Sequence, residues 1–389
     1  MRHPGLVRLR PVGPRHQFRH QSRDRSEEVN ISEPLKVAVV GLGRMGLVHA
    51  LHVLELAAET KSCSIAALVD SDPQRARQFA ENNGVDAPVL SSIDELIHAD
   101  VCRATIVVTP TDRHREHATS LIEAGHRILL EKPLTGTLEQ DREFAAHLDC
   151  SHAESLMLAF QRRFDEPLQH AKDLMTTGAV GRVFKIYSSL EDSNPAPNGY
   201  QSGGILPDMS VHNVDEILWL TGRMPSAALA IGSRIYSHAL TTCQEDFDDA
   251  LLYAWFDNDL VAQVQVTRNH VSGYRVETIM YGEKGQIRIG RFEQKPLEVV
   301  VEAYGPRGRA TPIAHRVFSM RDYQRPLPEF VDRFGAAYKS EVAEFIDCCR
   351  ADKAFPTSHH DGLRAQEVIS AAMRAVITPD HAAKIRAAK

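Results

Sequence analysis

A glycine-rich turn between an apolar strand and a helix constrains this chain more than any other feature. The run Leu35–Val40 is apolar and leads into Gly41-Leu42-Gly43-Arg44-Met45-Gly46, which has the spacing Gly-x-Gly-x-x-Gly. In that motif the first glycine makes a tight turn, the second lets the backbone approach a pyrophosphate, and the third lets the helix pack on the sheet. Free N–H groups at the start of the helix then favour a phosphate. The motif predicts a dinucleotide-binding strand–helix unit.

The next predicted strand, Ser64–Val69, ends in an acid of the type expected at an adenosine ribose. This acid, Asp70, follows the glycines at about the expected distance of 20 residues. An aspartate there binds ribose hydroxyls and repels a 2′-phosphate, which favours NAD over NADP. Ser71 and Arg75 follow closely and could accept a 2′-phosphate if Asp70 points away. A flavodoxin-like turn without a nucleotide is the alternative reading of the glycines themselves.

Length and composition limit the classes of protein to consider. With 389 residues, of which 43% are hydrophobic and 25% charged, the chain has the composition of a globular protein with two domains. A net charge of −6 disfavours nucleic acid as the main partner. No apolar run approaches the ~20 residues that span a bilayer. The six cysteines form no Cys-x-x-Cys pair and no zinc-like spacing with histidine, which favours a cytoplasmic enzyme without a metal.

Hydrophobic patterning divides the chain into three parts. Residues 1–34 are rich in arginine, and we expect a disordered extension rather than a transit peptide because its prolines oppose an amphipathic helix. Strand and helix patterns alternate over residues 35–160, as in a doubly wound, parallel α/β Rossmann sheet. Short alternating strands in residues 161–389 predict an α+β domain with an open-faced, mainly antiparallel sheet. We expect the helices from about residue 329 onward to pack back on the Rossmann domain.

Glu131-Lys132-Pro133 is the first of two motifs that could carry chemistry. It follows the predicted strand Arg127–Leu130 and so lies at the carboxyl edge of the parallel sheet, where ligands bind in open α/β folds. A lysine at that edge can donate a hydrogen bond to a substrate hydroxyl and stabilise an alkoxide. The proline fixes the turn, and a cis peptide before it is possible. In isolation the tripeptide would be interpreted as a surface turn.

The second motif begins a helix that we predict near Pro207 to Leu220. At about 100° per residue, Asp208, His212 and Asp215 fall within about 60° of one another on one helix face. A carboxylate one turn before a histidine can fix its tautomer and raise its pKa, as a general base for alcohol oxidation requires. We therefore predict that Asp208 orients His212 and shifts its pKa upward. In isolation the two residues would be interpreted as a surface pair.

A third segment, Phe160–Asp165, follows the last predicted Rossmann strand and contains Arg162 and Arg163. Their guanidinium groups could reach a cofactor or a substrate. They could equally face solvent in a loop, and the residue pattern leaves both alternatives open.

Four motifs in the same order resemble the glucose–fructose oxidoreductase and inositol dehydrogenase (Gfo/Idh/MocA) family, particularly its inositol 2-dehydrogenases. These motifs are Gly41–Gly46, Glu131–Pro133, Gly203–Asp215, and Arg333–Glu341 with Asp361-Gly362 behind it. The resemblance covers roughly residues 35–378. It implies a Rossmann domain followed by an open-faced sheet domain, NAD(P) as cofactor, oxidation of a ring hydroxyl, and often tetramers assembled through the sheets.

The resemblance also implies roles for individual residues. Lys132, Asp208 and His212 match the catalytic residues of the family. The residues expected at the substrate are these three together with Arg163, Asp215 and Tyr274. The residues expected at the cofactor are Gly41, Gly43, Arg44, Met45, Gly46, Asp70, Thr109, Pro110, His114, Glu131, Lys132 and Gln161. Asn269–Glu277 keeps only Gly273 and Tyr274 of a Tyr-Gly-Tyr-Asp pattern typical of bacterial inositol dehydrogenases, so the reaction class is better supported than the identity of the polyol.

Three functions are compatible with these features. The first is NAD-dependent oxidation of a ring hydroxyl of a cyclitol such as myo-inositol, with His212 as the base and Lys132 supporting the alkoxide. The second is oxidation of another sugar or deoxy-sugar by the same residues. The third is a non-catalytic NAD-binding sensor, which would need the glycines but not an intact catalytic set. We expect a cytoplasmic homotetramer, assembled through the C-terminal sheet, that acts on a small polyol or sugar.

Overall fold

The computed structural model describes residues 33–193, 203–234, 247–270, 273–290, 298–306, 311–320 and 329–378. The predicted extension at residues 1–34 lies almost entirely outside these ranges. From residue 34 onward the chain forms one unit that contains two sheets. Among the helices of the described ranges, none is long and apolar enough to span a bilayer.

The first sheet is entirely parallel, with its six strands in the order β3-β2-β1-β4-β5-β6, and confirms the predicted doubly wound fold. Its strands are β1 (Leu35–Val40), β2 (Cys63–Val69), β3 (Val89–Leu90), β4 (Ala104–Val107), β5 (Arg127–Glu131) and β6 (Leu156–Ala159). Its helices are α1 (Arg44–Thr60), α2 (Pro73–Asn83), α3 (Ile93–Ala99), α4 (His114–Glu123) and α5 (Leu138–Ser151). The strand order reverses between β1 and β4, and the carboxyl ends of strands at such a point form a ligand-binding crevice.

Local sequence explains why these elements begin and end where they do. Val37, Ala38 and Val39 of β1 are fully buried, as expected for a parallel strand covered by helices on both faces. Asp72 caps α2 by accepting the backbone N–H of Gln74. The same helix ends at a glycine in the left-handed conformation.

The second sheet is mixed and has nine strands in the order β14-β13-β12-β11-β7-β10-β9-β8-β15. Its strands are β7 (Val183–Glu191), β8 (Ala227–Ser233), β9 (Asp249–Phe256), β10 (Leu260–Thr267), β11 (Arg275–Gly282), β12 (Gly285–Ile289), β13 (Glu298–Tyr304), β14 (Ala314–Ser319) and β15 (Val376–Ile377). Most neighbours are antiparallel, as predicted, but β7 pairs with β10, and β8 with β15, in parallel. The strands β7 and β10 therefore end at the same edge of the sheet.

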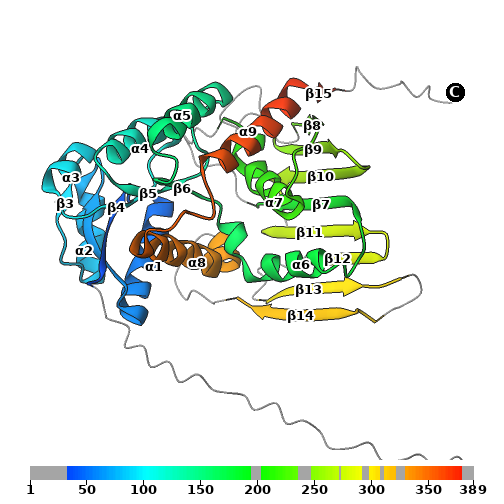
Figure 1. Ribbon diagram of the computed structural model, residues 1–389, viewed down its shortest axis with the longest axis horizontal. Coiled ribbons are helices and arrows are strands. Elements are labelled where there is room, and N and C mark those ends of the chain that lie inside the picture. The colour runs from blue at the N-terminus through cyan, green and yellow to red at the C-terminus, as the bar shows by residue number, and fades with distance from the viewer. Residues whose placement is uncertain are drawn as a thin grey trace, which may run out of the picture. The chain divides into compact units, whose positions relative to one another are not determined.

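Helices α6 (Glu166–Thr176), α7 (Val211–Thr221) and α9 (His359–Arg374) cover one face of this second sheet (Figure 1). A π-helical turn, η3 (Leu206–Ser210), leads into α7. Burial alternates along β9: Ala250, Leu252 and Ala254 are buried, whereas Trp255 on the other face is 38% exposed. The sheet thus has a covered face, which positions α7, and a second face that the helices leave uncovered in the described part of the chain.

Helix α8 (Glu329–Ala351) packs against α1 and against strands β1 and β5 of the first sheet (Figure 1). Its Arg333 binds both carboxylate oxygens of Asp165, at 2.7 and 2.8 Å, in a buried ion pair. Its Tyr338 ring meets the edge of the His49 ring of α1, with 5.9 Å between their centres. These contacts bring the first half of α8 close to the glycine motif.

Candidate active site

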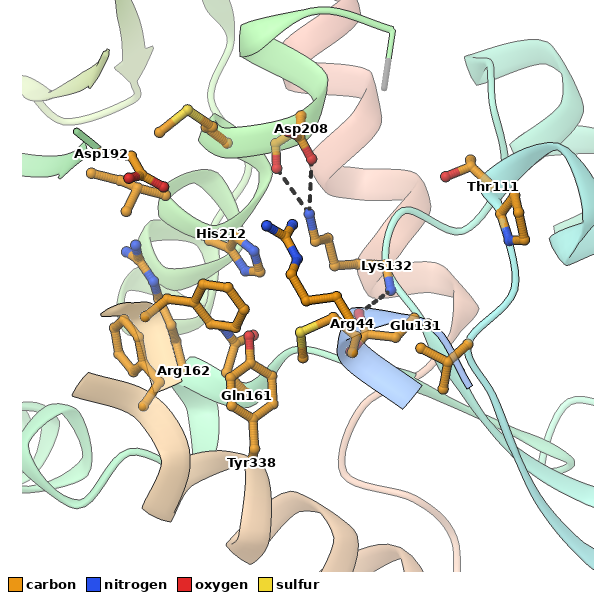
Figure 2. Close-up of a pocket in the computed structure, with 18 of the residues that line it drawn as sticks. Arg44, Thr111, Glu131, Lys132, Gln161, Arg162, Asp192, Asp208, His212 and Tyr338 are labelled. Atoms are coloured by element: carbon orange, nitrogen blue, oxygen red, sulfur yellow. Dashed lines mark hydrogen bonds and ion pairs between the residues drawn. The ribbon is translucent and has the colours of Figure 1, made fainter. Parts of the chain in front are cut away.

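A cavity of ≈ 760 Å³ lies where the carboxyl ends of the first sheet's strands face the second sheet. A volume of this order is typical of sites for small molecules and cofactors. One wall contains the glycine motif and the segments that follow β4, β5 and β6, and the other contains η3, α7, α8 and the ends of β7 and β10. Figure 2 shows charged side chains from both walls pointing toward the cavity.

The three glycines of the motif meet different surroundings. A Cβ atom on Gly41, whose φ is 89°, would lie 2.5 Å from the carbonyl oxygen of Val108. One on Gly46 would lie 1.7 Å from the carbonyl oxygen of Gly41, so neither position accepts a side chain. Gly43 lines the cavity, and a Cβ there would have no neighbouring atom within 4 Å. This open approach to the backbone at the start of α1 fits the pyrophosphate of NAD.

Arg44 and Met45, inside the motif, also line the cavity. The guanidinium group of Arg44 points into it (Figure 2) and lies 5.4 Å from the centre of the Phe330 ring of α8. A cation beside the glycine turn is well placed to pair with a phosphate of the cofactor.

Asp70 directly follows β2, as predicted, but it is not part of the cavity wall. Its carboxylate accepts the backbone N–H of Leu42 at 2.7 Å and that of Asp72 at 2.8 Å, and the residue is only 6% exposed. The guanidinium group of Arg75 lies 3.7 Å from the same carboxylate. Asp70 therefore fixes the glycine turn to the loop after β2, and its contact with a ribose stays a prediction.

The segment after β4 contributes Thr109, Pro110 and His114 to the cavity wall. The two ring nitrogens of His114 lie 2.9 Å from the carbonyl oxygen of Thr109 and 2.8 Å from that of Pro133. Burial lowers the pKa of His114, and a neutral imidazole donates from only one nitrogen. The buried ring ties this segment to the turn that contains Lys132.

Glu131 and Lys132 stand at the end of β5, on the cavity wall. Oε1 of Glu131 lies 2.8 Å from Nε2 of the buried His49, and Oε2 accepts the backbone N–H of Lys132 at 3.1 Å. Burial raises the pKa of Glu131, but the hydrogen bond and charge of His49 outweigh it, so the pKa falls below its usual value. The peptide bond between Lys132 and Pro133 is cis.

Lys132 and Asp208 meet across the cavity (Figure 2). Nζ of Lys132 donates to the backbone oxygen of Asp208 at 3.0 Å and to its Oδ1 at 3.3 Å. The other carboxylate oxygen, Oδ2, accepts from the Arg268 guanidinium at 2.8 Å. The Asp208 carboxylate is thus held between two cations.

This arrangement corrects the prediction that Asp208 orients His212. The prediction assumed α-helical spacing, but residues Leu206–Ser210 form a π-helical turn. A π-helix is wider than an α-helix, so residues four apart no longer lie directly above one another. Nδ1 of His212 is buried, and no hydrogen-bond partner for it exists among the described residues.

The pKa of His212 is also shifted in the opposite direction from the one predicted. Burial, followed by the charges of Lys132 and Arg162, lowers this pKa well below its usual value. An upward shift needs a carboxylate partner, and the carboxylate of Asp208 binds Lys132 and Arg268 instead. The imidazole is consequently neutral at neutral pH, which is the form that accepts a proton.

Two consecutive arginines bind two consecutive acids of α7. Nη1 of Arg162 lies 2.7 Å from Oε2 of Glu216, and both side chains are buried. Arg163 binds both carboxylate oxygens of Asp215, at 3.0 and 2.5 Å. Its Nη2 atom also lies 2.9 Å from Oδ1 of Asp361, in the first turn of α9. The 3₁₀ turn after β6, η2 (Gln161–Phe164), is thereby tied to α7.

These ion pairs correct the predicted substrate contacts. Arg163 and Asp215 do not line the cavity, and they bind each other in a buried ion pair. Gln161, predicted at the cofactor, does line it, and so does Arg162. Nε and Nη2 of Arg162 are buried and have no hydrogen-bond partner among the described residues.

Tyr274, predicted at the substrate, lines the cavity and is 7% exposed. Tyr338 of α8 lines it too, although the motif analysis assigned it no role. Burial raises the pKa of both phenols, so their hydroxyls stay protonated and can donate.

Asp112, Asp192 and Arg268 are charged cavity residues that sequence reasoning missed, and the last two belong to the second sheet's side of the cavity. Asp192 follows β7 and Arg268 follows β10, and these parallel strands pair Glu191 with Thr267. The two residues therefore reach the same sheet edge. A signal did exist, because each follows the end of a predicted strand, but alternation of burial does not reveal which strands run parallel.

Comparison with known proteins gives two family matches. Residues 35–158 match an oxidoreductase family described by its NAD-binding Rossmann fold. Residues 172–379 match the C-terminal alpha/beta domain of the same oxidoreductase family. The two matches together cover both sheets.

Individual relatives are similar over most of the chain. A myo-inositol dehydrogenase of Streptomyces leeuwenhoekii, Hyg17, is 30% identical over 337 residues, which are 85% of this chain and 94% of the relative. A scyllo-inositol 2-dehydrogenase (NAD(+)) of Bacillus subtilis is 27% identical, with 82% of this chain and 87% of the relative covered. Among solved structures, scyllo-inositol dehydrogenase from Lactobacillus casei with bound NAD(H) and scyllo-inositol has a TM-score of 0.73 at 25% identity, covering 88% of this chain and 97% of that one.

Proposed function

This chain belongs to the Gfo/Idh/MocA oxidoreductase family, and on that premise we propose that it is an NAD-dependent dehydrogenase of the inositol type. The reaction oxidises a ring hydroxyl of a cyclitol such as myo-inositol to the ketone. The observation that carries this proposal is the meeting of Lys132, Asp208 and His212 in one cavity with the glycine motif. The named inositol dehydrogenases among its relatives support a cyclitol as the substrate.

The residues present fit NAD, and we assign them as follows. Gly43 and the N-terminus of α1 would bind the pyrophosphate, and Arg44 would pair with its charge. Asp70, at the end of β2, would bind the adenosine ribose. When bound, NAD supplies the nicotinamide that accepts the hydride from the oxidised carbon. Met45, Thr109, Pro110 and Gln161 complete the wall on this side.

His212 acts as the general base. Because its Nδ1 atom is buried, the proton of the substrate hydroxyl is transferred to Nε2. Lys132 donates a hydrogen bond to the same oxygen and stabilises the alkoxide as it forms. The carboxylate of Asp208 positions the Lys132 ammonium group, which is its role in place of orienting His212.

We also propose a cytoplasmic homotetramer assembled through the uncovered face of the second sheet. On that face the rings of Tyr253 and Trp255 stack with 6.5 Å between centres, and Ile231 is 40% exposed. Neighbouring exposed apolar side chains are typical of an interaction surface. The cysteines of the described residues are unpaired, as in a reducing compartment. Light scattering of the purified chain measures the assembly.

Initial rates of nicotinamide reduction test the proposed function. The substrates are myo-inositol, scyllo-inositol and a set of aldoses and deoxy-sugars, each with NAD and with NADP. We expect the highest kcat/KM for a cyclitol with NAD. Preference for an aldose would replace the cyclitol proposal with the sugar alternative, and NAD binding without turnover on any of them would indicate a sensor.

Lys132→Met tests the catalytic assignment. Loss of one group that stabilises a developing oxyanion lowers turnover by about 10²–10³. The melting temperature should change little, because Arg268 still neutralises Asp208. Wild-type turnover in this variant would remove Lys132 from the mechanism.

A further inference from the structure

Three side chains with metal-binding atoms converge outside the cavity, where α5 meets the start of α9. They are Asp149 of α5 and the consecutive His359 and His360 of α9, and their ligand atoms all lie within 4.8 Å of one another. Oδ1 of Asp149 is 2.9 Å from Nε2 of His359 and 3.0 Å from Nε2 of His360. We propose that this cluster binds a divalent transition-metal ion of the zinc class and joins α5 to α9.

The donor atoms suit such an ion. Two imidazole nitrogens and a carboxylate oxygen are ligands that zinc prefers, and in a tetrahedral site they lie roughly 3.3 Å apart. The observed separations of 2.9 and 3.0 Å are shorter by a few tenths of an ångström. The side chains of His360 and Asp149 are 53% and 45% exposed, so they can rotate outward and leave coordination positions to water. The side chain of His359 is 1% exposed and provides the fixed ligand.

The protonation states also suit a cation. Metal ligands must be deprotonated. Burial lowers the pKa of His359, and the hydrogen bond from His359 lowers the pKa of Asp149. The positive end of the α9 dipole disfavours the charge of an ion at this position, and the carboxylate of Asp149 offsets this effect.

A hydrogen-bonded cluster without an ion is the alternative for this geometry. Each imidazole would have to hold its proton on Nε2 in order to donate to the same oxygen of Asp149. The two rings nevertheless lie side by side, with 4.2 Å between their centres. Both Nε2 atoms lie within 3.0 Å of Oδ1 of Asp149, and an ion would bind between these three atoms in place of the two hydrogen bonds.

The site is structural rather than catalytic in this proposal. None of its three residues lines the cavity. His359 and Asp149 are 210 positions apart, so the spacing of cysteine and histidine along the sequence gave no sign of it. An ion here would add a bond between the Rossmann half and the helix that carries Asp361, the partner of Arg163.

Calorimetric titration of the full-length, chelator-treated chain with zinc chloride tests the proposal. We expect the wild-type chain to bind one more zinc equivalent than Asp149→Asn or His360→Asn, or to bind it at least about tenfold more tightly. Zinc should raise the melting temperature of the wild type, and EDTA should reverse the shift. His98→Asn is the matched control, because His98 is an exposed histidine on a helix and belongs to no cluster of metal-binding side chains among the described residues. This variant should titrate and melt as the wild type does.

Two outcomes overturn the proposal. One is a wild-type chain that binds no zinc equivalent. The other is an Asp149→Asn or His360→Asn variant that binds zinc, and gains the same melting temperature from it, as the wild type does. Both substitutions replace exposed side chains, and a circular dichroism spectrum shows that the variants are folded. Binding is measured without substrate, so failure here is independent of the proposed dehydrogenase activity.

Discussion

The two walls of the cavity are held in place by different kinds of interaction. The glycine wall contains the glycine motif and the segments after β4, β5 and β6, and the α7 wall contains η3, α7, α8 and the ends of β7 and β10. The glycine wall is fixed sterically and locally, since the Cβ missing from Gly46 leaves room for the carbonyl oxygen of Gly41, five positions earlier. The α7 wall is fixed by charges from distant parts of the chain. Arg162 and Glu216 are 54 positions apart, and Lys132 and Asp208 are 76 apart. Short motifs thus encode the cofactor side, whereas the completed fold is needed to place the substrate side.

This difference implies that the walls respond differently to substitution. Removing one charge from the α7 wall leaves another charge buried without a partner, which is costly. On the glycine wall, changes of side-chain charge act mainly on the choice of cofactor. The following predictions test this separation.

His212→Ala isolates the chemistry of the α7 wall and has the largest expected effect. Loss of a general base lowers turnover by about 10²–10⁴. Affinity for the reduced cofactor, NADH, should stay near that of the wild type, because the glycine wall is unchanged. Stopped-flow rates and a separate NADH titration measure the two quantities. If NADH affinity fell along with turnover, the two walls would not be independent.

Arg163→Met tests how strongly buried charge holds α7. The guanidinium group lies between Asp215 and Asp361, and its removal leaves the buried carboxylate of Asp215 without its cation, whereas Asp361 keeps its ion pair with Arg364. We expect the free energy of unfolding to fall by about 3–5 kcal/mol, measured by urea denaturation.

The matched control for this variant is Arg142→Met. Arg142 of α5 forms an exposed ion pair with Glu367 of α9, at 3.2 Å. Such a pair contributes at most about 1 kcal/mol. Equal destabilisation by both substitutions would show that burial does not set the strength of these pairs.

What the sequence alone could predict follows the same division. The motif at Gly41–Gly46 and the position of Lys132 at a strand end are local patterns, and both lead to the cavity. Sequence patterns cannot show that Arg162, rather than Arg163, lines the cavity. The outcome depends on the rotation of a short 3₁₀ turn relative to α7. The π-helical turn before α7 was equally hidden, since it moves Asp208 away from His212 without a distinctive residue pattern.

The pH dependence of oxidation reports on the charges around His212. Its pKa is lowered by burial and by the cations Lys132 and Arg162, so the base stays unprotonated below the usual histidine range. We expect kcat/KM for oxidation to remain constant from pH 8 down through pH 6.5 and to fall only at lower pH, as His212 gains a proton. The double variant Arg162→Met/Glu216→Gln removes one cation together with its partner. This change should shift the acidic limb of the profile, where kcat/KM falls, toward higher pH. An unchanged limb would show that Arg162 does not act on His212.

Asp70→Ala tests a residue that fixes the glycine turn although it does not itself line the cavity, and it has the smallest expected effect. The carboxylate is expected to bind the adenosine ribose and to repel a 2′-phosphate, and it also accepts the N–H groups of Leu42 and Asp72. Loss of a charged hydrogen bond reduces the preference for NAD over NADP by about 1–3 kcal/mol, as a ratio of kcat/KM values. Asp72→Ala is the control, because Asp72 caps α2 nearby and should leave that ratio unchanged. Turnover at saturating NAD should change far less than in His212→Ala, since no side chain of the α7 wall is altered. If Asp70→Ala lowered turnover as steeply but kept the cofactor preference, Asp70 would act only by fixing the glycine turn, and the charge that selects the cofactor would lie elsewhere.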